Sequence, residues 1–299
     1  MTSRSLRIAS LTIAALALSA CGSVGVAADG KVDGKLAIVS AFYPLQYATQ
    51  QVGGELVSVT SLTKPGAEPH DIELTPKDVA TVSKAGVVVY EKGLQGAVDK
   101  AVESQGGNRG LDVAPAANLN LRLPTGATDP HFWLDPQRYS DVAKVISSRL
   151  SSVDPANKAR YETNAKAFED KLAALSSEFS AGLASCQRRE IVTSHSAFGY
   201  LAQRFGMKQI AINGLSPGQE PKAADLAAVS TYARAHGVTT IYAETLVSPA
   251  IAATVARESG AVMATLDPIE GLTKQSAGKD YFEVMRSNLK ALRTGQGCA

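Results

Sequence analysis

The sequence predicts an α/β protein of two lobes, each with a mainly parallel sheet flanked by helices, joined by one long helix. Three observations favour this class. Short apolar segments alternate with helical patterns on both sides of a central stretch. The chain of 299 residues is long enough for two cores rather than one. The central stretch is amphipathic and longer than a single small domain needs.

The N-terminus predicts a secretory signal over residues 1–20. Arg4 and Arg7 precede an apolar run that ends in Leu18-Ser19-Ala20-Cys21. This run is too short and too polar for a mature membrane span. Its ending resembles the bacterial lipobox, which predicts cleavage before the cysteine and attachment of a diacylglycerol to its sulfur. Ordinary secretory cleavage near Ala27-Ala28 is the alternative.

The segment 21–34 is rich in Gly, Ala and Val and predicts a flexible tether. Removing the two arginines of the signal takes the formal charge from +2 to zero, which leaves no broad positive field for nucleic acid. Cys186 and Cys298 then remain as thiols in an oxidising compartment. We expect them to form a disulfide between the C-terminus and the second lobe; two unpaired cysteines are the alternative.

The N-terminal lobe is expected over residues 35–154. Its predicted elements are strands at Lys35–Ser40, Leu56–Leu62 and Gly86–Tyr90, with a helix through Tyr47 that ends at Gly53-Gly54. A good N-cap residue followed by proline marks four helix starts along the chain. These are Thr75-Pro76, Asp135-Pro136, Asp154-Pro155 and Ser248-Pro249. Asp78 adds a capping-box partner to the first of them.

The linking helix is expected over residues 155–185, at about 1.5 Å per residue on the order of 45 Å long. Its apolar positions recur at spacings of three, four and seven: Tyr161, Phe168, Leu172, Leu175, Phe179 and Leu183. The alternation of strands and helices restarts in a C-terminal lobe over residues 186–299. Its predicted elements are strands at Glu190–Ser194, Gln209–Ile212, Thr239–Ala243 and Val262–Leu266, and a closing helix at Tyr281–Leu292.

Three of the four histidines, His70, His131 and His195, sit at or just beyond predicted strand ends, and Asp267 occupies the same kind of position. In open parallel sheets, ligands bind in the crevice outside the carboxyl ends of the strands. Two candidates fall in each lobe, so they can converge only across an interlobe cleft. Three imidazoles and one carboxylate suit one tetrahedral zinc ion. The fourth histidine, His236, ends a predicted helix, where it suits the helix dipole.

Four stretches carry a resemblance to a known family: Pro65–Asp71 with Thr75-Pro76, Asp129–Pro136, Thr193–Tyr200 and Glu244–Pro249. With these motifs the mature chain resembles the zinc and manganese substrate-binding proteins of bacterial ABC importers, the cluster A-I or TroA-like family. The resemblance implies two α/β lobes joined by a long helix, with limited movement of the lobes. It also implies a metal ion held by His70, His131, His195 and Asp267.

The histidine at position 195 makes the chain similar to the zinc-type members of the family, because manganese-type members carry a carboxylate at that position. The expected transported ion is therefore Zn²⁺, with Mn²⁺ second. The chain lacks the histidine-rich acidic loop that many zinc members have before His131, so we expect no accessory capture of metal. The resemblance implies a binding protein rather than an enzyme, lipid-anchored through Cys21 on the extracytoplasmic face of the cell membrane. It would deliver its ion to an ABC permease with its ATPase, and we expect a monomer.

Two alternatives remain from the residues alone. The first is a zinc-dependent hydrolase with Glu244 or Glu68 as its base, although the sequence has no His-Glu-x-x-His helix. The second is a surface adhesin whose fold is stabilised by metal. Phe132 and Trp133, beside His131, are interpreted as packing residues that shield the site.

Overall fold

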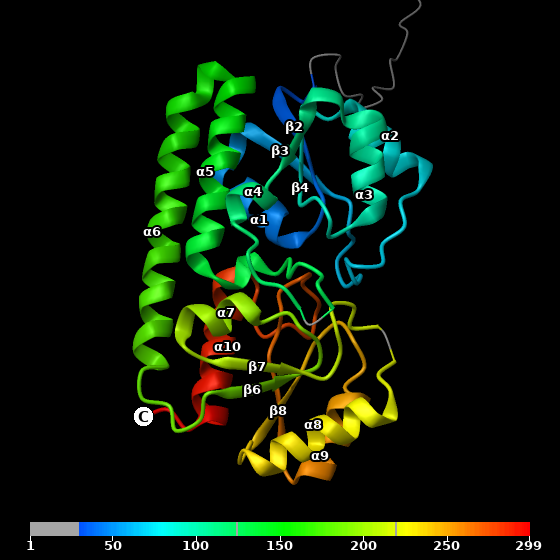
Figure 1. Ribbon diagram of the computed structural model, residues 1–299. Coiled ribbons are helices and arrows are strands. Elements are labelled where there is room, and N and C mark those ends of the chain that lie inside the picture. The colour runs from blue at the N-terminus through cyan, green and yellow to red at the C-terminus, as the bar shows by residue number, and fades with distance from the viewer. Residues whose placement is uncertain (1–29, 124, 219) are drawn as a thin grey trace, which may run out of the picture.

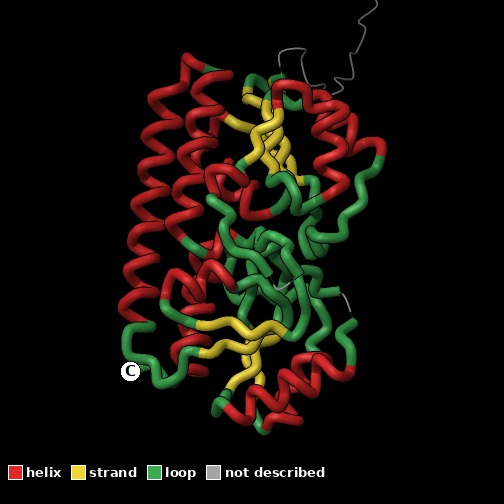
Figure 2. Tube along the Cα trace, in the orientation of Figure 1, coloured by secondary structure: helices red, strands yellow, loops and turns green. Residues whose placement is uncertain are grey.

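The computed structural model describes residues 30–299 except 124 and 219 and has two α/β lobes with a long helix beside both (Figure 1). The strands of each lobe lie inside and the helices outside, with loops between the two sheets (Figure 2). The predicted signal peptide, Cys21 and the first part of the predicted tether lie outside the described residues. Within the described part, no helix is long and apolar enough to cross a membrane.

The sheet of the first lobe is built around β2 (Lys35–Ser40). This strand pairs in parallel with β3 (Val57–Ser61) and β4 (Val87–Tyr90), and β4 pairs in parallel with β5 (Gly110–Asp112). The helices of this lobe are α1 (Tyr43–Gly53), α2 (Pro76–Lys84), α3 (Gly96–Ala101) and α4 (Ala114–Ala117). The three predicted strands agree with the structure to within one residue at each end, whereas the short β5 was not predicted.

The tether prediction was wrong for its last residues. Lys31–Val32 forms β1, which pairs antiparallel with the start of β2. Asp33 and Gly34 connect the two strands, with φ of 49° and 77°. Positive φ at both central residues is what a two-residue hairpin turn of type I′ requires, and Asp-Gly supplies it readily. The sequence therefore contained the signal for this hairpin.

Of the four predicted helix starts, two are capped in the structure as expected and two differ from the prediction. Thr75 caps α2 through a capping box with Asp78, and Asp135 caps α5 (Pro136–Val153) by accepting a hydrogen bond from the backbone of Gln137. Asp154-Pro155 begins a single 3₁₀ turn rather than an α-helix. Ser248-Pro249 lies just ahead of α9, which begins at Ala250.

The long helix α6 (Lys158–Gly182) follows that 3₁₀ turn. It is shorter than expected, because the turn takes its first residues and the helix ends at Gly182; its 25 residues span about 37 Å. All but the last of the apolar positions predicted for it are buried within it, and Leu183 is buried immediately after its end. The helix runs beside α5 and reaches from the first lobe to the second (Figure 1).

The second lobe holds a four-stranded, fully parallel sheet in the order β7-β6-β8-β9. Its strands are β6 (Glu190–Thr193), β7 (Lys208–Ala211), β8 (Thr240–Ala243) and β9 (Val262–Thr265). Its helices are α7 (Gly199–Phe205), α8 (Ala223–Ala235), α9 (Ala250–Ser259) and α10 (Tyr281–Gln296). The predicted strands again agree to within one residue at each end.

One hydrophobic core runs from the first lobe through α5 and α6 into the second lobe. Tyr139 of α5 and Tyr281 of α10 meet in it with ring centroids 4.8 Å apart. The Tyr281 hydroxyl donates to the backbone oxygen of Trp133 (2.6 Å), and the Trp133 indole donates to the backbone oxygen of Pro268 (2.7 Å). The lobes are thus joined by buried packing and buried hydrogen bonds, as well as by the long helix.

A disulfide joins Cys186 to Cys298, 112 residues apart in the sequence. It ties the chain after α10 to the segment that follows α6. The alternative of two unpaired cysteines is therefore not what the structure contains.

We expect the double substitution Cys186→Ala/Cys298→Ala to lower the free energy of unfolding by about 2–4 kcal/mol, because the closed loop is long and its closure restricts the unfolded chain. Urea denaturation followed by circular dichroism measures this change. A reductant should lower the stability of the wild type to a similar extent and leave the double variant unchanged. Equal unfolding midpoints for wild type and variant would contradict the expectation.

Candidate metal centre

His70 lies in the loop between β3 and α2 and is held by its own neighbours. The side chain of Gln95, which is buried, donates to the backbone oxygen of Pro69 and to the hydroxyl of Thr63, both at 3.0 Å. The backbone N–H of His70 donates to the Glu68 carboxylate at 2.9 Å. These bonds fix the loop on both sides of the imidazole.

His131 is fully buried in the segment that leads into α5. The carboxylate of Asp129 accepts hydrogen bonds from its backbone N–H and from Nδ1 of its ring, both at 2.9 Å. A Cβ atom at Gly199, at the start of α7, would overlap the other oxygen of this carboxylate. Glycine is therefore required where the second lobe approaches Asp129.

His195 lies two residues beyond the end of β6 and is also fully buried. Glu244, the residue after β8, accepts hydrogen bonds from its backbone N–H at 2.9 Å and from Nδ1 at 2.6 Å. The carboxyl ends of two neighbouring parallel strands thus supply the ligand and its support. For His131 and His195, Nδ1–H donates a hydrogen bond to a carboxylate, which leaves Nε2 available as a donor atom for a metal.

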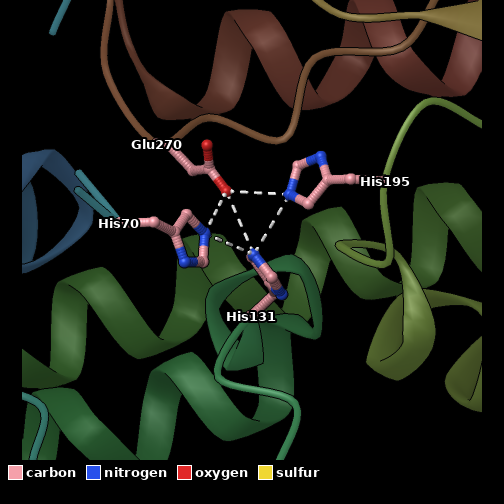
Figure 3. Close-up of side chains that lie close together, drawn as sticks. All are labelled: His70, His131, His195 and Glu270. Atoms are coloured by element: carbon pink, nitrogen blue, oxygen red, sulfur yellow. Dashed lines mark hydrogen bonds and ion pairs between the residues drawn. The ribbon is translucent and has the colours of Figure 1, made fainter. Parts of the chain in front are cut away.

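The fourth member of the cluster is Glu270 (Figure 3). Its Oε1 lies 3.2 Å from Nε2 of His70, 3.0 Å from Nε2 of His131 and 3.2 Å from Nε2 of His195. Nε2 of His131 is 3.2 Å from that of His70 and 3.4 Å from that of His195. A zinc ion with bonds of about 2.0–2.1 Å holds tetrahedral donors about 3.3–3.4 Å apart. The four atoms therefore have nearly the spacing that one zinc ion requires.

Asp267 does not join this cluster, and the fourth donor predicted from the sequence is replaced by Glu270. The Asp267 carboxylate makes other hydrogen bonds: one oxygen accepts from the backbone N–H of Ile269 in its own loop (2.8 Å), and the other accepts from the hydroxyl of Thr245 in the loop after β8 (3.0 Å). Both carboxylates follow β9 within a few residues, and strand-end position alone does not distinguish them. The Glu270 carboxylate is also fully buried.

The supporting carboxylates Asp129 and Glu244 were not predicted in that role. Both were visible in the sequence, as members of Asp129–Pro136 and Glu244–Pro249. Glu244 is not available as the base of a hydrolase, because both of its oxygens accept hydrogen bonds from His195. Trp133 packs its ring against His131 with centroids 5.3 Å apart, as expected of a shielding residue.

Burial opposes a positive charge on each of the three histidines, and the neighbouring carboxylates decide the result. Burial prevails at His70 and lowers its pKa. At His131 and His195 the adjacent carboxylates outweigh burial, so the pKa of His131 is raised and that of His195 is raised well above its ordinary value of 6.5. Burial also acts to raise the pKa of Glu270, but the charge on His195 and the hydrogen bonds of the three rings hold it well below 4.5.

His236 lies apart from this centre, at the C-terminal end of α8. Its ring is stacked on Tyr232 with centroids 3.8 Å apart, and its Nδ1 lies 2.9 Å from the Tyr232 backbone oxygen. This agrees with the predicted role at a helix end.

One known protein family matches nearly the whole of the described chain. The family described as "Zinc-uptake complex component A periplasmic" matches residues 38–295. The high-affinity zinc uptake system protein ZnuA of Bacillus subtilis (strain 168) is 37% identical over 298 residues, which cover 93% of each chain. The zinc-binding lipoprotein AdcA of Streptococcus pneumoniae (serotype 4, strain TIGR4) is 37% identical over 97% of this chain, which spans only 60% of that relative.

Solved structures agree with the sequence relatives. The Zn(II)-bound ZnuA-like domain of Streptococcus pneumoniae AdcA has a TM-score of 0.76 and 38% identity, covering 88% of this chain and 99% of that one. The laminin-binding protein Lmb of Streptococcus agalactiae, described as bifunctional with adhesin and metal-transporting activity, has a TM-score of 0.77 and 32% identity. The match covers 87% of this chain and 99% of that one.

We expect zinc affinity to fall as the pH is lowered, because protons compete with the ion for the imidazoles. Since the pKa values of His131 and His195 are raised, this competition should begin above the ordinary histidine range, and affinity should still increase with pH between about 6.5 and 8. Each displaced proton changes the affinity about tenfold per pH unit. Competition titration against a chelator measures the zinc affinity at each pH. A constant affinity between about pH 6 and pH 8 would contradict a site built from these three imidazoles.

Proposed function

The chain belongs to the zinc-uptake complex component A family, and from this premise we propose that it captures Zn²⁺ outside the cytoplasmic membrane and delivers it to an ABC importer. The ion is the cargo, held by Nε2 of His70, His131 and His195 and by Oε1 of Glu270. The observation that carries this proposal is the convergence of these four atoms at near-tetrahedral spacing.

The donor set favours zinc over manganese. Three imidazole nitrogens and one carboxylate oxygen suit zinc, whereas manganese prefers oxygen donors. The general order of affinity also places manganese lowest and zinc well above it. His195 contributes the nitrogen that distinguishes this set from one richer in oxygen.

The hydrolase alternative finds no support at this centre. A catalytic zinc keeps one position open for water, whereas four protein atoms converge here. The family is one of zinc-uptake binding components and not of enzymes. The adhesin alternative has weak support: a relative, Lmb, is described as an adhesin as well as a metal transporter. The site described in this chain supports metal binding and gives no evidence for adhesion.

We place the protein on the extracytoplasmic face of the cell membrane, held by a lipid on Cys21. The lipobox-like ending of the signal supports this location, as does the description of a relative as a lipoprotein. Its proposed partners are an ABC permease and the associated ATPase. We further propose that it works as a monomer, with the lobe boundaries near residues 154 and 186 on either side of the linking helix.

Glu270→Gln should weaken zinc binding by more than about 100-fold, because it replaces an anionic donor by a neutral amide at the centre of the cluster. Metal analysis of protein purified without added metal, followed by competition titration, measures the loss. Glu73→Gln makes the same chemical change at an exposed position, in the loop between β3 and α2, and should leave the affinity unchanged. Wild-type protein without zinc affinity would contradict the proposed function itself.

Cys21→Ala should move the protein from the membrane fraction to the soluble fraction while leaving zinc affinity intact, because the predicted anchor precedes the folded lobes. Cell fractionation with immunoblotting follows the location, and titration of the released protein follows the affinity. A variant that stays with the membrane would contradict the lipid anchor.

A further inference from the structure

Ile269, the residue before Glu270, has a backbone conformation that its side chain disfavours. Its φ is +58°, in the left-handed region, and the residue is fully buried. A β-branched side chain is rarely found there. The other described non-glycine residues with positive φ are Asp33 and Asn118, types that tolerate this region. Something must therefore hold Ile269 in place.

The hydrogen bonds of Asp267 provide that restraint. Its Oδ1 accepts from the backbone N–H of Ile269 at 2.8 Å, and its Oδ2 accepts from the Thr245 hydroxyl at 3.0 Å. Its own backbone is held on both sides by Asn288, whose side chain accepts from the Asp267 N–H (2.9 Å) and donates to the Asp267 oxygen (2.7 Å). Between the two residues, the Pro268 oxygen accepts from the indole of Trp133.

The direction of the chain at Ile269 decides where the next side chain points. With Ile269 left-handed, the Glu270 carboxylate reaches all three imidazoles. In an ordinary extended or helical conformation at Ile269, the chain would leave Ile269 in another direction and carry Glu270 away from the imidazoles. The position of the fourth metal donor thus depends on a conformation that Asp267 stabilises from within the loop.

We propose that Asp267 is a positioning residue that holds Ile269 in the left-handed conformation and so places Glu270 on the metal. The inference rests on the proposed function, since it concerns the same ion. It differs from the role first predicted for Asp267, that of a ligand. A ligand needs its negative charge, whereas a positioning residue needs only an oxygen that accepts from the Ile269 N–H.

Two substitutions separate these roles. Asp267→Ala removes the acceptor and should lower zinc affinity about 10- to 100-fold, the range typical of residues that support a ligand. Asp267→Asn keeps an oxygen for the Ile269 N–H, and its amide can donate to the Thr245 hydroxyl. It should bind within about threefold of wild type. Equal losses in the two variants would indicate a ligand and overturn the proposal, as would an alanine variant with wild-type affinity.

The absorption spectrum of bound Co²⁺ reports the donor set directly. Asp267→Ala should shift the spectrum toward that of Glu270→Gln, because the Glu270 carboxylate is no longer held on the ion as in wild type, and Asp267→Asn should keep the wild-type spectrum. A wild-type spectrum for Asp267→Ala would overturn the proposal. If wild type binds neither ion, the proposed function fails, which is a distinct outcome from failure of this inference.

A rescue tests the route through Ile269. Glycine adopts the left-handed region freely, so Asp267→Ala/Ile269→Gly should recover much of the affinity lost in Asp267→Ala. Circular dichroism checks that each variant folds. If Asp267→Ala does not fold, Thr245→Val, which removes the hydrogen bond from Thr245 to Asp267, should lower affinity severalfold, and adding Ile269→Gly should restore it. A glycine that restores nothing would overturn the proposal.

Discussion

The structure depends on keeping four electron-rich atoms from four separate loops within 3.4 Å of their neighbours. Lone pairs at this distance repel one another unless a cation or a proton lies between them. Hydrogen bonds hold the three histidines in place against that repulsion. Asp129 accepts from His131, Glu244 accepts from His195, and Gln95 donates to the backbone oxygen of Pro69, the residue before His70. A site held open in this way is prepared for an ion.

The large core shared by the lobes provides the second part of this preparation. Tyr281 of the second lobe bonds to the backbone of Trp133, and Trp133 bonds to the backbone of Pro268. The segment that carries His131 in the first lobe is therefore connected by buried hydrogen bonds to the loop that carries Glu270 in the second. Since both bonds lie in an apolar interior, breaking either one leaves polar groups without partners, which is unfavourable.

Much of the fold could be predicted from the sequence, because short apolar strands, proline-marked helix starts and a long amphipathic stretch are local signals. The three histidines could also be predicted, since strand ends in parallel sheets mark the crevice. The choice between Asp267 and Glu270 could not, because it depends on the φ of Ile269 and on a bond from Trp133 in the other lobe. The β1 hairpin differs in kind: Asp33-Gly34 is a local hairpin signal, but it lies at the end of a segment whose Gly-, Ala- and Val-rich composition also suits a tether.

The shared core also bears on how long an ion stays bound. Two lobes connected only by a flexible hinge release a ligand by swinging apart, whereas lobes fused through Tyr139, Tyr281 and the long helix have little freedom to do so. Moving one ligand-bearing loop breaks fewer buried contacts than separating the lobes, so the shared core favours loss of the ion through a loop. A docking surface that displaces one such loop would then shorten the residence time of the ion without separating the lobes.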